Sequence, residues 1–143
     1  KGNGAVFSMP EKTKEDTKPT RLEVEFLEAL RRRCPAHEPI LEALGHVYTR
    51  AGRFQDGLQV DLELTRLRPD DPESWYNLAC SHALLGNQLA AIEALERAIR
   101  QGYSDAHWME TDPDLASLAH DPAFICMVKQ LRQKAGARWG AGR

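Results

Sequence analysis

The chain has 143 residues, of which 42% are hydrophobic and 28% are charged, and its formal net charge is −2. This length suits one domain with a modest core, and the weakly acidic balance argues against a nucleic-acid surface. No apolar run approaches the roughly 18 residues that a membrane-spanning helix needs. We therefore expect neither a membrane span nor a nucleic-acid partner.

The first 19 residues differ from the rest of the chain. From Glu11 to Pro19 the sequence is charged and has no apolar residue, which predicts a disordered linker. Ahead of this linker, residues 5–9 form a short apolar island. We interpret the island either as an unstructured end or as a docking peptide on a flexible tether. The chain begins with Lys1 rather than Met, as expected of a fragment or a processed product.

A first helix is predicted to begin after Thr20, which forms a capping-box pattern with Glu23. Apolar residues then recur at helical spacing, and they are Leu22, Phe26, Leu27 and Leu30. The last predicted turn is basic, as the helix dipole favours, and it contains Arg31, Arg32 and Arg33. Pro35 then ends the helix.

The next two units, residues 38–71 and 72–105, each predict a pair of helices. In the first unit the predicted inward residues are Leu41, Leu44, Val47 and Tyr48, followed by Leu58, Leu62 and Leu64. In the second unit they are Trp75, Leu78, Ala79 and His82, followed by Leu89, Ile92, Leu95 and Ile99. Gly52 and Gly86 supply the turns within the pairs, because glycine accepts a left-handed backbone.

A third unit begins near Ala106 and then departs from the pattern. Asp112 and Asp121 each precede a proline, which repeats the combination of cap and proline at Asp71. These starts predict a short helix at 113–119 and a longer helix at 122–134. The predicted inward residues of the longer helix are Phe124, Ile125, Val128 and Leu131.

The middle units repeat with a period of 34 residues, since Pro35 recurs as Pro69 and Gly52 as Gly86. Such a period is typical of stacked helix pairs. Matching residues in the first unit are Leu41, Leu44, Gly45, Tyr48, Gly57, Leu64 and Pro69. Those in the second unit are Trp75, Leu78, Ala79, His82, Ala91, Ala98 and Tyr103. Over about residues 20–110 the chain thus resembles the tetratricopeptide repeat.

This resemblance implies an all-α fold, a right-handed superhelical solenoid of antiparallel helix pairs. It implies about 2.5–3 repeats and C-terminal capping helices. The predicted domain organisation is a disordered segment at 1–19, a helical domain at 20–134 and a flexible tail at 135–143.

In the tetratricopeptide family, the first helices of successive units line a concave groove. Here the resemblance places in that groove Glu42, His46, Thr49, Arg50, Glu73, Tyr76, Asn77, Cys80 and Leu84. We expect Tyr76 to pack on an extended peptide and Asn77 to hydrogen-bond to its backbone. Some members clamp a C-terminal carboxylate with a Lys and an Asn, but Glu42 and His46 replace these residues, so this ligand is not expected.

Two residues depart from the family pattern. Asp61 stands where the family places a large apolar residue, and a buried unpaired carboxylate is costly. We therefore expect it at a partly exposed edge of the core or paired with a basic residue, for which the candidates are Arg21, Arg31 and Arg32. Leu64 replaces a small residue, which predicts looser or shifted packing between the two units.

The titratable residues form no catalytic, metal-binding or cofactor-binding motif. Cys80 and His82 point to different faces of one helix. The acidic residues near the C-terminus are better explained as helix caps, and they are Asp112, Asp114 and Asp121. We expect free, largely buried thiols at the cysteines, which are Cys34, Cys80 and Cys126. No enzymatic activity, metal or cofactor is predicted.

Three functions remain open. The leading hypothesis is a scaffold or adaptor whose groove binds a peptide or helix of a partner protein. The second is self-association, through residues 5–9 in a neighbour's groove or through an open apolar flank of the first helix. The third is a docking or regulatory domain of a larger enzyme. Free thiols favour a cytoplasmic location.

Overall fold

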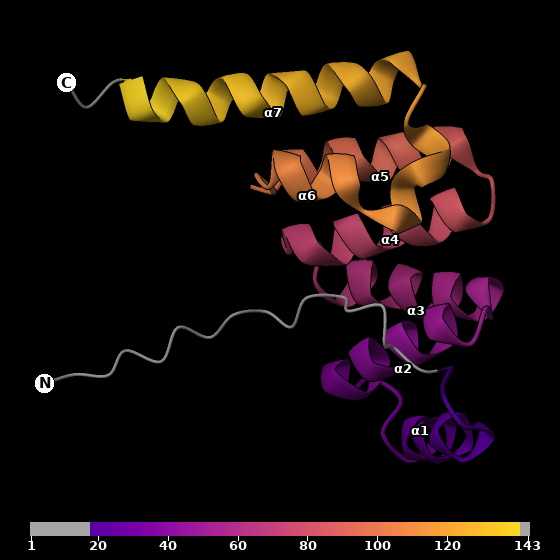
Figure 1. The fold of residues 1–143 in the computed structure, drawn as a ribbon. Helices are drawn as coiled ribbons and strands as arrows, with labels where there is room; N and C mark the ends of the chain where they lie inside the picture. The colour runs from indigo at the N-terminus through magenta and orange to yellow at the C-terminus, as the bar shows by residue number, and fades with distance from the viewer. Residues whose placement is uncertain (1–17, 141–143) are drawn as a thin grey trace, which may run out of the picture.

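The computed structural model describes residues 18–140, and this range is all-helical. Its elements are α1 (Arg21–Arg33), α2 (Glu38–Arg50), α3 (Phe54–Leu67), α4 (Pro72–Leu84), α5 (Gln88–Arg100), α6 (Ala106–Thr111), the 3-10 helix η1 (Pro113–Leu118) and α7 (Pro122–Gly140). They stack in chain order from α1 at one end to α7 at the other (Figure 1). No described helix is long and apolar enough to cross a membrane. Most of the predicted linker, the apolar island and residues 141–143 lie outside the described range.

The helix starts keep the 34-residue period through all three units. The first helices of the units begin at Glu38, Pro72 and Ala106, and the second helices begin at Phe54, Gln88 and Pro122. The predicted start of the last helix at residue 122 is confirmed. This start keeps the period, although we expected the third unit to leave the register after Ala106. The irregularity is confined to the segment between α6 and α7, where Asp112 and the proline after it end α6 and begin η1.

Local signals account for the helix ends. Thr20 and Glu23 form the predicted capping box at α1. The side chain of Asp71 accepts hydrogen bonds from the first-turn amides of α4. Gly52 and Gly86, which follow α2 and α4, have φ of 73° and 78°. Left-handed backbone of this kind favours glycine, so the predicted turns are confirmed.

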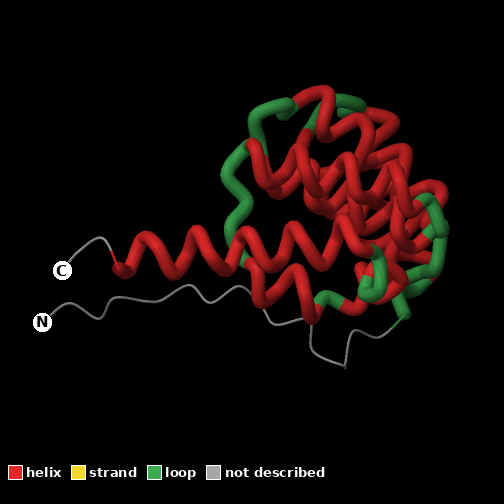
Figure 2. Tube along the Cα trace, turned by 90° about the horizontal axis from the view of Figure 1, so that it is seen from above, coloured by secondary structure: helices red, strands yellow, loops and turns green. Residues whose placement is uncertain are grey.

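The last helix is longer than predicted. It was expected to end at residue 134, but α7 continues to Gly140, through most of the predicted flexible tail. Figure 2 shows its final turns extending beyond the stack. Residues 132–138 are all exposed, so this part of α7 does not contribute to the hydrophobic core.

The buried side chains form two clusters. The first joins α1, α2 and α3, and it contains Val24, Leu41, Leu44, Val47, Tyr48, Val60 and Leu64. The second extends from Leu58 of α3 through α4 and α5 to α7, where it includes Phe124, Met127, Val128 and Leu131. Several of the apolar residues that recur at helical spacing are exposed, namely Leu22, Phe26, Leu62, Leu89 and Ile125. Helical spacing identified their helices correctly but overestimated the width of each buried face.

Asp61 is buried, and no arginine pairs with it. The hydroxyl of Ser81 on α4 donates a 2.5 Å hydrogen bond to its Oδ2. Arg31 instead binds Glu63 at 2.7 Å and Arg21 binds Glu25 at 2.6 Å. Burial raises the pKa of Asp61 to about 6, against the lowering effect of the Ser81 hydrogen bond. The carboxyl group is thus a buried polar link between α3 and α4.

The cysteines agree with the prediction only in part. All three are free, as expected. Cys80 is buried, whereas Cys34 and Cys126 are exposed. Cys34 caps the exposed end of α1 and Cys126 lies on the outer face of α7, so neither enters the core.

Candidate binding surface

The predicted groove residues lie on α2 and α4, and they differ in how far solvent reaches them. Glu42, His46 and Glu73 are exposed. Four others are half-buried, namely Thr49, Arg50, Asn77 and Leu84. Tyr76 and Cys80 are buried. We call the seven residues that remain at least partly accessible the α2–α4 face.

Tyr76 does not present its ring to solvent. Its hydroxyl donates a 2.9 Å hydrogen bond to Oδ2 of Asp112. Its ring stacks on that of Tyr103 with centroids 4.4 Å apart and planes 9° apart. Burial is the main cause of a strongly raised pKa for the Tyr76 hydroxyl. In this arrangement Tyr76 anchors the segment after α6 and does not form the expected peptide-stacking platform.

Cys80 lies beside the same carboxylate. Its Sγ is 3.8 Å from Oδ2 of Asp112, while the amide of Asp114 donates a 3.0 Å hydrogen bond to Oδ1. The Sγ of Cys80 and one carboxylate oxygen each of Asp112 and Asp114 lie within 4.8 Å of one another. The donors around Asp112 explain its burial, because a buried carboxylate needs hydrogen-bond partners. They make it a cap and a link between α4 and η1.

The segment η1 closes this part of the predicted groove. The hydroxyl of Ser117 donates to the carbonyl oxygen of Ala83 at 3.3 Å, and the side chain of Gln88 donates to the carbonyl oxygen of Ser117 at 3.4 Å. The chain therefore places its own backbone across the C-terminal part of α4. The sequence identified Asp112 as a helix cap but did not reveal its hydrogen bond with Tyr76, because these two residues are far apart in the chain.

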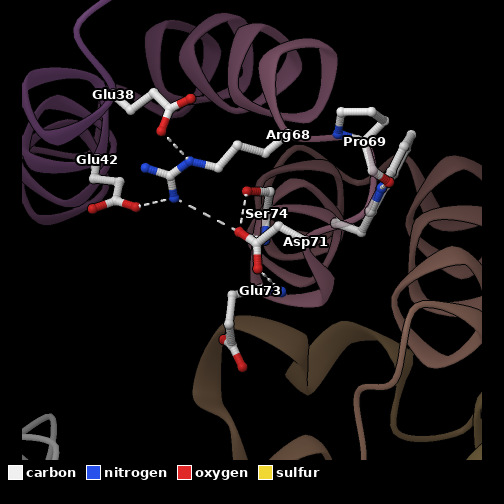
Figure 3. Close-up of polar contacts among 8 residues, drawn as sticks. Glu38, Glu42, Arg68, Pro69, Asp71, Glu73 and Ser74 are labelled. Atoms are coloured by element: carbon white, nitrogen blue, oxygen red, sulfur yellow. Dashed lines mark hydrogen bonds and ion pairs between the residues drawn. The ribbon is translucent and has the colours of Figure 1, made fainter.

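At the other end of the face, Arg68 joins three carboxylates (Figure 3). Its Nε donates to Glu38 at 2.6 Å, and one of its terminal nitrogens lies 2.5 Å from Glu42 and 3.7 Å from Asp71. Glu42 is thus engaged within the chain. Arg68 was not predicted, although the spacing of four residues between the two glutamates on one helix indicates a basic partner.

Nearby, the backbone of Pro69 holds the second unit in place. Its carbonyl oxygen accepts a 2.8 Å hydrogen bond from the indole nitrogen of Trp75. On the opposite side of Asp71, Glu73 has a raised pKa because of desolvation first, and because of the carboxylates of Asp71 and Asp105 second. This end of the face is therefore electronegative apart from Arg68.

The open centre of the face is formed by side chains without partners inside the described range. Over residues 18–140, the side chains of His46, Glu73 and Asn77 make no hydrogen bond or ion pair. Thr49, by contrast, donates to the carbonyl oxygen of Gly45 at 3.0 Å. His46 lies on α2 and Asn77 on α4, and each of these helices packs against α3. Accessible polar side chains without partners in the described range are suited to binding a polar ligand.

Comparison with known proteins finds a distant and partial similarity. No protein-family model matches the sequence. A similar curated protein is a chloroplastic protein of Arabidopsis thaliana, which is 29% identical over 89 residues. The aligned part covers 60% of this chain and 27% of that protein. The chain thus spans about a quarter of the length of the curated relative it matches.

Proposed function

We propose that this chain is a protein-interaction module of the tetratricopeptide type, which binds a peptide or helix of a partner on the α2–α4 face. The 34-residue spacing of the helix starts across three units supports the repeat assignment. Stacked helix pairs of this kind display continuous surfaces that bind other proteins. The cytoplasmic location remains a prediction.

The observation that carries the binding proposal is the open pair His46 and Asn77. Both are accessible, and within residues 18–140 neither side chain has a hydrogen-bonding partner. The amide of Asn77 offers donors and an acceptor, which match the carbonyl and amide groups of an extended peptide. His46 adds ring nitrogens that can donate and accept hydrogen bonds. Because η1 covers Tyr76, the proposed contact is polar and lies toward α2.

The experiment selects peptides from a displayed random library against the full chain and measures the affinity of the enriched sequences. The double variant His46→Ala, Asn77→Ala is expected to bind these peptides at least about tenfold more weakly, as loss of hydrogen bonds to the ligand requires. The matched control is Gln59→Ala, Arg66→Ala, which alters two exposed residues of α3. Peptide binding that survives in the α2–α4 variant, or that is lost in the α3 variant, contradicts the proposed surface.

A further inference from the structure

The outward face of α1 is apolar and uncovered. Leu22 is 74% exposed and Phe26, one helical turn later, is 61% exposed. Ala29 and Arg33 continue this line at helical spacing. We call these four residues the α1 stripe. The opposite side of α1 buries Val24 in the first hydrophobic cluster, so the helix is anchored by one face and open on the other.

The position of α1 makes this exposure unusual. It is the end of the stack, and no described element lies beyond it (Figure 1). End units of helical stacks need a polar outer face to stay soluble, and α1, with two large apolar side chains exposed, departs from this more than α7 at the opposite end, where Ile125 is 52% exposed. Large apolar side chains exposed together and bordered by charges mark interaction sites.

The charged side chains of α1 indicate which partner packs on the α1 stripe. The first half of the helix carries the exposed residues Arg21, Glu23 and Glu25, of which Arg21 pairs with Glu25 at 2.6 Å. Its last turn is wholly basic in charge and includes the exposed Arg32 and Arg33. Two copies of such a helix fit best when they run antiparallel, because the basic last turn of each then lies beside the two glutamates of the other and not beside the other basic last turn. The helix dipoles also oppose one another favourably in this orientation.

We propose that α1 mediates a two-fold symmetric dimer of this chain, with the α1 stripes of two copies packed antiparallel. The large Phe26 of one copy lies near the small Ala29 of the other, since these residues flank the middle of the helix. A helix of 13 residues is about 20 Å long, so the contact is smaller than the roughly 1,200 Å² found in stable complexes. The dimer is accordingly weak and depends on concentration.

The test is sedimentation velocity of the full chain from low micromolar to several hundred micromolar. The wild type is expected to shift from monomer to dimer across this range. In Leu22→Gln, Phe26→Gln, the dissociation constant is expected to rise at least about tenfold, because the apolar contact is removed. Glutamine keeps a good helix propensity, and circular dichroism verifies that the variant is folded. Leu89→Gln is the matched control, since Leu89 on α5 is also 74% exposed.

Two further variants identify the occupant. Glu25→Arg is expected to weaken the dimer, and adding Arg32→Glu is expected to restore it, because the swap recreates the complementary pattern. Phe7→Asp alters the apolar island and is expected to leave the dimer unchanged. The proposal is overturned if the wild type stays monomeric throughout, if the stripe variant dimerises like the wild type, or if Phe7→Asp abolishes the dimer.

Discussion

In the C-terminal half of the stack, one continuous cluster of buried side chains joins α4 to α7, whereas α1, α2 and α3 share a smaller cluster. The larger cluster also encloses a polar link, the hydrogen bond from Tyr76 to Asp112. The smaller cluster is bordered by partly exposed ion pairs, among them Arg31 with Glu63 and Arg68 with Glu38. The two halves thus combine apolar and polar stabilisation in different proportions.

This difference separates the region that contributes most to stability from the regions that are accessible for binding. Burial of large side chains contributes the most to stability, and it is concentrated from α4 to α7. Partly exposed ion pairs contribute little, yet the N-terminal half carries the accessible His46 and the α1 stripe. The α1 stripe thus lies wholly in the half with the smaller core, whereas the α2–α4 face spans the junction between the halves, with His46 on α2 and Asn77 on α4.

The largest contrast is expected between two phenylalanines at opposite ends. Phe124→Ala in α7 removes a side chain that is 4% exposed and is expected to lower the free energy of unfolding by about 3–5 kcal/mol. Phe26→Ala in α1 removes a mostly exposed side chain and is expected to cost less than about 1 kcal/mol. Urea unfolding at low protein concentration measures both. Equal losses would contradict the assignment of the main core to the C-terminal half.

A second test addresses the junction between the halves. The pKa of Asp61 is raised from 3.8 to about 6 in the folded chain, so the folded state binds this proton more tightly than the unfolded state. The resulting stabilisation, about 3 kcal/mol, is fully present below the unfolded pKa and is lost as pH rises through about 6. Asp61→Asn removes this contribution to the pH dependence.

Urea unfolding at several pH values, in the wild type and in Asp61→Asn, isolates the effect. Other carboxyl groups titrate in both proteins and cancel in the difference. The wild type is expected to lose stability relative to the variant between about pH 4 and pH 7. A difference that stays constant over this interval would show that Asp61 is not a buried group linking α3 and α4.

A third test compares one buried hydroxyl in each half. Tyr76→Phe leaves the buried carboxylate of Asp112 without one of its donors, and a loss of about 1–3 kcal/mol is expected. Tyr48→Phe removes a 2.9 Å hydrogen bond to the partly exposed Glu28, whose carboxylate can turn to water, so about 1 kcal/mol or less is expected. Thermal unfolding ranks the two variants. A larger loss for Tyr48→Phe would reverse the comparison.

The smallest effect is expected at the ion-pair cluster. Arg68→Met removes the contacts to Glu38 and Glu42 while retaining an apolar stem, and it is expected to lower the free energy of unfolding by about 1 kcal/mol or less. The loss should shrink further at high salt, because partly exposed charges are screened. Chemical unfolding at low and high salt measures this. A loss comparable to that of Phe124→Ala would mean that Arg68 is a main source of stability.

Most of the helix boundaries were predictable because local groups set them. Thr20 and Asp71 cap their helices with their own side chains, and Gly52 adopts the left-handed backbone that few other residues accept. These interactions span a few residues and are visible in the sequence. The end of α7 was missed because glycine is a poor helix former, yet α7 continues through Gly136 to Gly140.

The candidate site was less predictable, because long-range contacts determine it. The resemblance to the tetratricopeptide repeat placed Tyr76 and Asn77 together in the groove, but only the packing of η1 decides that Tyr76 is buried and that Asn77 stays accessible. The same holds for Asp61, whose partner is a serine on the next helix and not a nearby arginine.

The sequence alone thus determined the all-helical class, the 34-residue spacing and the turns, since each depends on local propensity and periodicity. The tertiary structure decided which helical faces are covered, as the exposure of Leu22 and Phe26 illustrates. Periodicity states that a helix has an apolar face. Only the position of neighbouring elements determines whether anything packs against it.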